Sequence, residues 1–306
     1  MAGAVEVTCY TDPGCSWAWG TEPKLRKLTF EFGEGLAWSY VMGGLVGNME
    51  VYASRLCRED GGARLAAYWR EVAAHTGMPT PVALSRAYRS TDPACRAVKA
   101  AQQQEEEVAL RVLRRLRESI FVLSRPTDNG EEILEAVRGV PRLDLGRLAC
   151  DLEDSQVEQA YRQDWEETRR PNEYTMALDD DSRPGAGKAR LTEGHWRYVF
   201  PTVIFQGPEG ERTAPGWQPY EAYLAAIEAV VPGTSATRLP PPEPRQLLDQ
   251  YGSAATKEIE VVCEMDRQAA LDAMEALEKE GVVVGWRVGE EVLWMLPAEA
   301  QSRGLD

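Results

Sequence analysis

The sequence predicts a protein of the α/β class, and two observations support this prediction. A strand, a helix and a second strand follow one another within residues 5–42, a pattern typical of two parallel strands joined by a helix. Two more strands return after a long helical stretch, at residues 202–205 and about 211–214. The chain has 306 residues, and at about 150 residues per domain this length predicts about two domains.

The first strand–helix–strand unit is the most regular part of the sequence. Residues 5–10, VEVTCY, alternate and are rich in β-branched side chains, which predicts a strand. Residues 11–14, TDPG, predict a turn. A helix is expected over 16–32, where Pro23 either kinks the helix or marks its restart. Residues 36–42, LAWSYVM, predict the second strand.

Residues 51–188 form a helical insertion between the two pairs of strands. Proline and glycine punctuate the pattern, and the helices are expected at 64–75, 93–124, 131–137, 145–148 and 155–169. The insertion ends in a polar, breaker-rich loop over 179–188.

The last third of the chain contains a helix, a linker and a small unit. An amphipathic helix is expected over 218–231, and the proline-rich stretch 233–244 is typical of a linker. Residues 245–297 contain short helices followed by an alternating hairpin that begins near Gly281. This order predicts a winged-helix-like module.

The charge and the hydropathy pattern exclude several classes of protein. The chain carries 34 basic and 49 acidic residues, a net charge of −15, which disfavours nucleic acid as a partner. Residues 251–306 alone carry 5 basic and 12 acidic residues, so the C-terminal module is not expected to bind DNA either. No apolar run reaches the ~18 residues that a membrane span needs, and no signal peptide is evident. We therefore expect a cytoplasmic protein without membrane contact.

The six cysteines are spread along the chain without the spacing of a metal site, and there are only two histidines, His75 and His195. No metal site is therefore expected. Five cysteines are interpreted as small buried apolar residues, namely Cys9, Cys57, Cys95, Cys150 and Cys263.

Cys15 differs because it lies in the segment 11–20, TDPGCSWAWG. This segment resembles the DsbA-like branch of the thioredoxin superfamily, in the cytosolic group that includes FrnE-type proteins and the adaptor that delivers Spx to ClpXP. The matching residues are Asp12, Pro13, Cys15, Trp17, Trp19 and Gly20. Four later motifs agree in order, VMGGL at 41–45, TDPACRA at 91–97, FPT at 200–202 and GWQPY at 216–220.

The resemblance spans about residues 4–232 and implies a thioredoxin-like fold with a large helical insertion. The thioredoxin-like domain would consist of residues 1–50 and 189–232. The insertion at 51–188, the linker at 233–244 and the winged-helix-like module at 245–297 complete the expected domain organisation.

The resemblance also implies the site residues. Cys15 and a cis-proline at Pro201 would be catalytic, and Trp17, Trp19, Phe200 and Thr202 would contact a substrate. Independently of the resemblance, a cysteine at a helix N-terminus faces unpaired N–H groups, which favour the thiolate. His195 is either a polar loop residue or a neighbour of Cys15.

Ala18 departs from the family pattern, because it stands where the second cysteine of the motif is expected. A dithiol centre releases its substrate when the second thiolate attacks the mixed disulfide. Without that thiol, Cys15 can form a mixed disulfide but cannot resolve it locally. Cys9 is a candidate resolving thiol, although its position in a strand predicts burial.

Three functions remain open from the sequence. The leading hypothesis is a thiol–disulfide oxidoreductase that acts on a protein or a small thiol through Cys15 alone. The first alternative is a redox-inactive protein-binding adaptor similar to the ClpXP–Spx adaptor, and the second is a glutathione-dependent isomerase or transferase. No cofactor is expected except glutathione or another low-molecular-weight thiol. The sequence does not decide whether the protein forms a homodimer.

Overall fold

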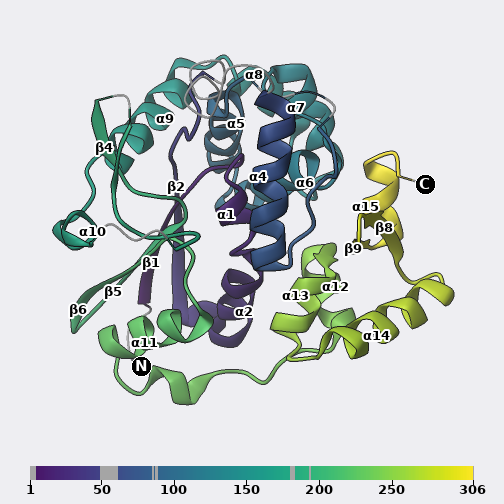
Figure 1. Cartoon of the computed structure of the whole chain (residues 1–306). Coiled ribbons are helices and arrows are strands. Elements are labelled where there is room, and N and C mark those ends of the chain that lie inside the picture. The colour runs from purple at the N-terminus through teal and green to yellow at the C-terminus, as the bar shows by residue number, and fades with distance from the viewer. Residues whose placement is uncertain are drawn as a thin grey trace.

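The computed structural model describes residues 5–48, 61–84, 86, 89–179, 183–192 and 194–305. At its centre is a four-stranded sheet in the order β2-β1-β5-β6 (Figure 1). The strands are β1 Val5–Thr11, β2 Leu36–Met42, β5 Thr202–Gly207 and β6 Gly210–Pro215. β1 pairs in parallel with β2 and antiparallel with β5, which in turn pairs antiparallel with β6. The α/β class and the thioredoxin-like sheet are thus confirmed.

The expected helix at 16–32 is divided into two helices. α1 spans Ser16–Trp19, and α2 spans Glu22–Phe32 with a short 3-10 turn, η1 Gly33–Gly35, after it. A Cβ atom on Gly20 would lie 2.5 Å from the side chain of Thr76, so only glycine allows this approach. Pro23 stands in the first turn of α2, where its missing N–H costs nothing. The expected restart therefore occurs there.

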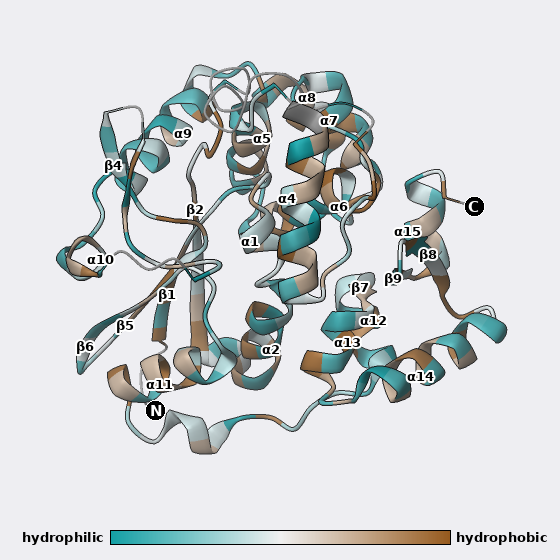
Figure 2. Ribbon diagram, viewed as in Figure 1, coloured by the Kyte–Doolittle hydropathy of each residue, from teal (hydrophilic) through white to brown (hydrophobic). Residues whose placement is uncertain are grey.

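One face of the sheet is covered by α2 and by α11, which spans Tyr220–Val230. Val5 and Val7 point to this face, since alternate side chains of a strand share a side. They pack there with Leu28 of α2 and Ile227 of α11. The outer strand β6 begins with exposed polar residues and is largely hydrophilic (Figure 2). The apolar core therefore lies at the inner strands.

The insertion is helical, as expected, and within the described residues it contains more helices than the five expected. They are α4 Gly61–Thr76, α5 Asp92–Gln102, α6 Glu106–Phe121, α7 Gly130–Ala136, α8 Leu145–Asp151, α9 Ser155–Thr168 and α10 Glu173–Ala177. The single helix expected at 93–124 is wrong, because the chain is extended at Glu105 and α6 packs on α5. This fold-back places Val98 of α5 and Val112 of α6 in one buried apolar cluster, which one straight helix would leave apart.

A short hairpin, β3 Arg190–Thr192 and β4 His195–Arg197, follows the insertion and was not expected. Its strands have only three residues each, too few for a recognisable alternation.

The C-terminal part begins after a 3-10 turn, η2 Thr234–Thr237. Its elements are α12 Pro244–Tyr251, β7 Ser253–Ala255, α13 Thr256–Val262, α14 Arg267–Lys279, β8 Val284–Val288, β9 Glu291–Met295 and α15 Pro297–Ser302. The strands form a sheet in the order β7-β9-β8. Helices and a hairpin are present in the expected order, while the winged-helix-like assignment and the domain boundaries stay predictions.

The C-terminal part is joined to the rest of the chain by a common core. Leu293 and Met295 of β9 lie in the same apolar cluster as Trp19 of α1. At this contact Glu258 forms buried ion pairs with Arg114, at 2.7 Å, and with Arg26, at 3.2 Å. Helix α1, which follows Cys15, therefore packs against the C-terminal part of the chain. None of the helices in the described ranges is long and apolar enough to cross a membrane.

Candidate functional site

The turn before Cys15 is held by the buried carboxylate of Asp12. This carboxylate accepts hydrogen bonds from the Gly14 amide at 2.7 Å, the Leu45 amide at 2.6 Å and the Thr91 hydroxyl at 2.9 Å. Burial raises the pKa of Asp12, and these donors oppose that rise. The carboxylate of Asp12 therefore joins three of the motif segments, namely 11–20, 41–45 and 91–97.

Cys15 is the N-cap residue of α1. Its sulfur accepts a hydrogen bond from the Ala18 amide at 3.4 Å, and its thiol donates one to the Phe200 carbonyl at 3.3 Å. The peptide bond between Phe200 and Pro201 is cis. The sulfur thus lies between the start of α1 and the proline loop, and only 4% of Cys15 is exposed.

The thiol of Cys15 is protonated at neutral pH. Burial raises its pKa to about 11, although the Ala18 amide and the charge of Arg117 lower it. The helix N-terminus favours the thiolate, as the sequence predicts, because the Ala18 amide lowers the pKa. Desolvation disfavours the charged form more strongly than this short helix favours it.

No second thiol stands beside Cys15 in the motif. Ala18 is 1% exposed and lies where the second cysteine was expected. Cys9 is buried in the cluster between the sheet and α2, as its strand position predicted, and burial raises its pKa to about 12. Cys15 belongs to a different apolar cluster.

The other cysteines follow the expected pattern with one exception. Cys95 and Cys263 are buried, whereas Cys150 is exposed on α8, so its predicted burial is wrong. Cys57 lies outside the described residues. Within the described ranges no group of three acidic, histidine or cysteine side chains could hold a metal ion.

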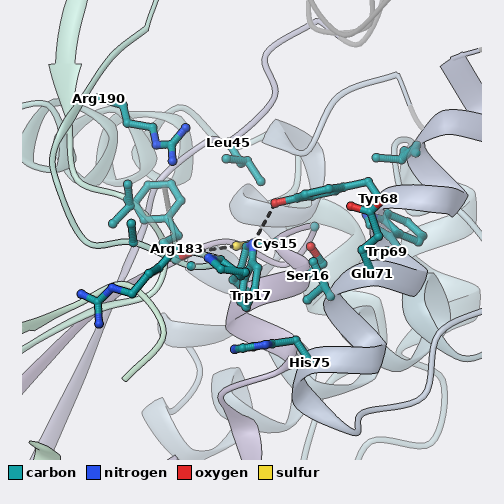
Figure 3. A pocket seen from close by; sticks show the side chains of 18 of the residues that line it. Cys15, Ser16, Trp17, Leu45, Tyr68, Trp69, Glu71, His75, Arg183 and Arg190 are labelled. Carbon is teal, nitrogen blue, oxygen red and sulfur yellow. Dashed lines mark hydrogen bonds between the residues drawn. The ribbon is translucent and has the colours of Figure 1, made fainter. Parts of the chain in front are cut away.

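A cleft of about 680 Å³ opens above Cys15 (Figure 3). Cys15 and Ser16 form its floor, α4 forms one wall, and residues 183–200 form the other. This volume is within the range of ligand sites, about 300–1,000 Å³. The lining residues of the α4 wall are Leu65, Tyr68, Trp69, Glu71, Val72, Ala74 and His75.

Trp17 is held at the edge of the cleft by aromatic neighbours. Its indole N–H donates to the hydroxyl of Tyr68 at 2.7 Å (Figure 3). Its ring meets His75 edge-on at 5.6 Å between centroids, and His75 in turn meets Trp217 at 4.6 Å. A Cβ atom on Gly185 would lie about 3.1 Å from the Trp17 ring, so the loop at 183–187 passes directly over it.

The remaining expected site residues divide into two groups. Trp17 and Phe200 line the cleft. Trp19 and Thr202 do not, because Trp19 donates its indole N–H to the Pro79 carbonyl and Thr202 donates its hydroxyl to the Val199 carbonyl. His195 stacks edge-on against Trp165 and is not among the residues that line the cleft.

Several lining residues were not anticipated. Sequence reasoning missed Tyr68, His75, Arg183, Arg190 and Arg197. They lie far from Cys15 in the sequence and belong to no recognised motif, so no local signal could have identified them.

Comparisons with known proteins agree with this geometry. The chain is 27% identical over 272 residues to the ClpXP adapter protein SpxH of Halalkalibacterium halodurans, covering 86% of this chain and 79% of that protein. It is 26% identical over 278 residues to SpxH of Shouchella clausii, covering 89% and 82%. A solved structure of a probable DsbA oxidoreductase from Streptomyces coelicolor superposes with a TM-score of 0.52 at 15% identity, covering 77% of this chain and 92% of that one.

A family model described as thioredoxin matches residues 9–171, more than half of the chain. These residues include the Cys15 turn, β2 and most of the helical insertion. Together with the sheet order and the cis-proline beside Cys15, the match establishes that the chain belongs to this thioredoxin family.

Proposed function

We propose that this protein is a cytoplasmic adaptor that binds a partner protein at the Cys15 cleft without thiol–disulfide exchange. One observation carries the proposal, namely that the only cysteine of the motif is buried, with Ala18 in place of a second thiol. Burial also raises the pKa of Cys15. Exchange by a self-contained dithiol centre requires an accessible thiolate and a second thiol that releases the product. The site lacks both of these features, yet its cleft is open to a ligand.

The relatives support the same function. Both SpxH proteins are ClpXP adapters, and each aligns with more than four fifths of this chain. An adaptor of this kind binds a protein and presents it to the protease, and this requires a specific surface but no reactive group. Presentation of a partner to a ClpXP-type protease is therefore the activity that we propose.

Degradation in a reconstituted system tests this proposal. A partner that copurifies with the wild-type protein is incubated with ClpXP and either wild type, a Cys15→Ala variant or a Cys150→Ala control. All three proteins should accelerate degradation equally, in the presence and in the absence of dithiothreitol. A partner that is held only through Cys15 and released by dithiothreitol would exclude the adaptor function as stated.

A second candidate, thiol chemistry through Cys15 alone, is favoured by the position of the sulfur. It lies on the floor of the open cleft and accepts the Ala18 amide, which would also stabilise a thiolate. The thiolate would attack a substrate disulfide, form a mixed disulfide and release the other sulfur as a thiol. An external thiol such as glutathione would then displace Cys15 and complete the exchange.

Mass spectrometry tests this second candidate. Incubation with oxidised glutathione at pH 7 should leave Cys15 unmodified if the adaptor function is correct. Rapid formation of a Cys15–glutathione adduct would favour the thiol mechanism. Calorimetry with reduced glutathione separates it from a glutathione-dependent isomerase or transferase, which must bind the free thiol non-covalently.

A further inference from the structure

A network of buried charged side chains connects the C-terminal part to the Cys15 turn. Its first member is Glu258, which is fully buried in α13, the helix that lies beside α2 (Figure 1). The Glu258 carboxylate accepts two hydrogen bonds from Arg114 of α6, at 2.9 and 2.7 Å, and forms an ion pair with Arg26 of α2 at 3.2 Å. It also accepts a hydrogen bond from the Ala255 amide at 2.7 Å. One carboxylate of the C-terminal part therefore binds two helices of the rest of the chain.

Arg114 extends this contact to the end of α1. Its guanidinium lies 4.5 Å from the centre of the Trp19 ring, and Trp19 is the last residue of α1. The indole N–H of Trp19 donates to the Pro79 carbonyl at 2.8 Å, so two separate segments hold the ring. The Trp19 amide in turn donates to the Cys15 carbonyl at 3.0 Å. The position of Arg114 therefore bears on the orientation of α1.

A second branch of the network reaches the strand that leads into the turn. Glu22 forms ion pairs with Arg114, at 3.5 Å, and with Arg117. Arg117 is buried and donates to the Thr11 hydroxyl at 2.5 Å. Thr11 is the last residue of β1 and directly precedes Asp12, whose carboxylate holds the turn. The network therefore ends on both sides of this turn.

Buried charge makes this junction selective for one arrangement. Apolar side chains of similar volume often hold two surfaces together equally well, because they avoid the cost of removing charges from water. A buried charge that loses its partner is costly, so a shift of α13 against α6 is penalised more than the sliding of apolar surfaces. We therefore expect the apolar core that Trp19 shares with Leu293 and Met295 to supply attraction, and the charges to fix the orientation.

We propose that Glu258 is a positioning residue of the Cys15 cleft. Docking of α13 sets the position of Arg114 and, through Trp19, the orientation of α1, so that Trp17 faces the cleft. The C-terminal part thus controls the shape of the cleft from outside, since none of the described residues that line the cleft belongs to it. The inference rests on the proposed function only in treating the cleft as the place where a partner binds.

Hydrogen exchange of the full-length protein, measured by mass spectrometry on peptides that contain α1, tests this inference. The amides of Trp19 and Gly20 donate to the carbonyls of Cys15 and Ser16, so their exchange reports the opening of α1. Glu258→Gln removes the charge but keeps the shape of the side chain, and it should speed this exchange at least about fivefold. Alkylation of Cys15 by iodoacetamide should become faster by a similar factor, because opening of α1 exposes the sulfur.

Glu299→Gln is the matched control, because it changes another carboxylate of the C-terminal part that pairs with α6. Glu299 forms ion pairs with Arg115 at 2.7 Å and with Arg303 at 3.1 Å. Arg115 also donates to the Arg138 carbonyl and the Ser302 hydroxyl, away from α1. The control should leave the exchange of α1 unchanged. Urea denaturation shows how far each variant lowers the free energy of unfolding.

Arg114→Lys tests the same link by a milder change, and it keeps the inference testable if the first variant does not fold. Lysine keeps the positive charge but has no planar group to lie on the Trp19 ring or to bind both oxygens of Glu258. This variant should therefore also speed the exchange of α1. Arg111→Lys, at a partly exposed position of the same helix, is its control and should have no effect.

Two results would overturn the inference. One is exchange of α1 at the wild-type rate in both Glu258→Gln and Arg114→Lys, and the other is an equal increase in Glu299→Gln, which would show only a general loss of stability. The proposed function would survive either result if wild type and Cys15→Ala still promote degradation of the copurified partner. Faster exchange of α1 in the variants, with no degradation by wild type, would instead refute the adaptor function and leave the positioning role intact.

Discussion

The thiol of Cys15 donates a hydrogen bond to the carbonyl oxygen of Phe200 across 3.3 Å. This contact uses the thiol proton, so it exists only while the sulfur is neutral. It links the start of α1 to the residue that precedes Pro201, and burial keeps the sulfur in the protonated form that the contact needs. Cys15 therefore joins two loops in this structure, a role that requires no redox partner.

The first prediction concerns the reactivity of Cys15. Because burial raises its pKa to about 11, Cys15 should react with iodoacetamide very slowly at pH 7 and faster as the pH rises toward 11. A pKa of 11 leaves roughly 300-fold less thiolate at pH 7 than the ordinary value near 8.5. Peptide mapping measures the rate, with the exposed Cys150 in the same molecule as the internal reference. Equal rates at pH 7 would contradict this prediction.

The second prediction concerns the missing thiol. Residues three apart on a helix have Cβ atoms about 5–6 Å apart, and the Ala18 amide already lies 3.4 Å from the Cys15 sulfur. An Ala18→Cys variant should therefore form an intramolecular disulfide with Cys15 on mild oxidation, seen as a loss of two hydrogens by mass spectrometry. Ala18→Ser is the control, and it should not lose two hydrogens on oxidation.

The third prediction concerns Asp12. Its carboxylate accepts hydrogen bonds from Gly14, Leu45 and Thr91, so Asp12→Ala removes the acceptor that these three donors share. We expect a loss of about 3–5 kcal/mol in the free energy of unfolding, measured by urea denaturation. Asp12→Asn retains one acceptor and should lose less. A loss below about 0.5 kcal/mol for Asp12→Ala, the size of an ordinary surface change, would show that these bonds do not hold the turn.

The fourth prediction concerns acid stability at the contact with the C-terminal part. Burial by itself would raise the pKa of Glu118, but Arg303 and Arg114 outweigh it and lower the pKa to about 2. Since the folded value lies below the unfolded value near 4.3, the contribution of this group is complete above about pH 5 and is lost as the pH falls toward 2. The full contribution is on the order of 3 kcal/mol.

Urea denaturation between pH 7 and pH 3 measures this contribution. Glu118→Gln should flatten the decline of the unfolding free energy over this range, whereas the exposed Glu135→Gln should retain it. A decline of equal slope in both variants would show that Glu118 does not titrate as described.

Two tryptophans illustrate how far the sequence could predict the site. Trp17 and Trp19 both match the motif, and both were expected to contact a substrate. Residues two apart on a helix point in different directions, so only one of them can face the cleft. Trp17 lines the cleft, while Trp19 lies in the core shared with Leu293 and Met295. Which tryptophan faces outward depends on where the C-terminal part packs, and that information is not local.

The helical insertion shows the same limit. Most of its helices were predicted from the helical pattern and from the proline and glycine residues between them, and three of them begin at capping side chains, Asn129, Asp144 and Asp154. The break at Glu105 carries no proline or glycine, so the periodicity continued across it. Only the packing of α6 on α5 makes the fold-back favourable.

The sequence by itself determined the α/β class, the motif around Cys15, the absence of a second thiol at residue 18 and the proline at 201. Each of these properties can be read from a short segment of the sequence, because it depends on residues that are close along the chain. The tertiary structure alone decided that Cys15 is neutral and that three arginines line its cleft. The physical reason is that desolvation and the local field are set by segments far apart in sequence, which only folding brings together.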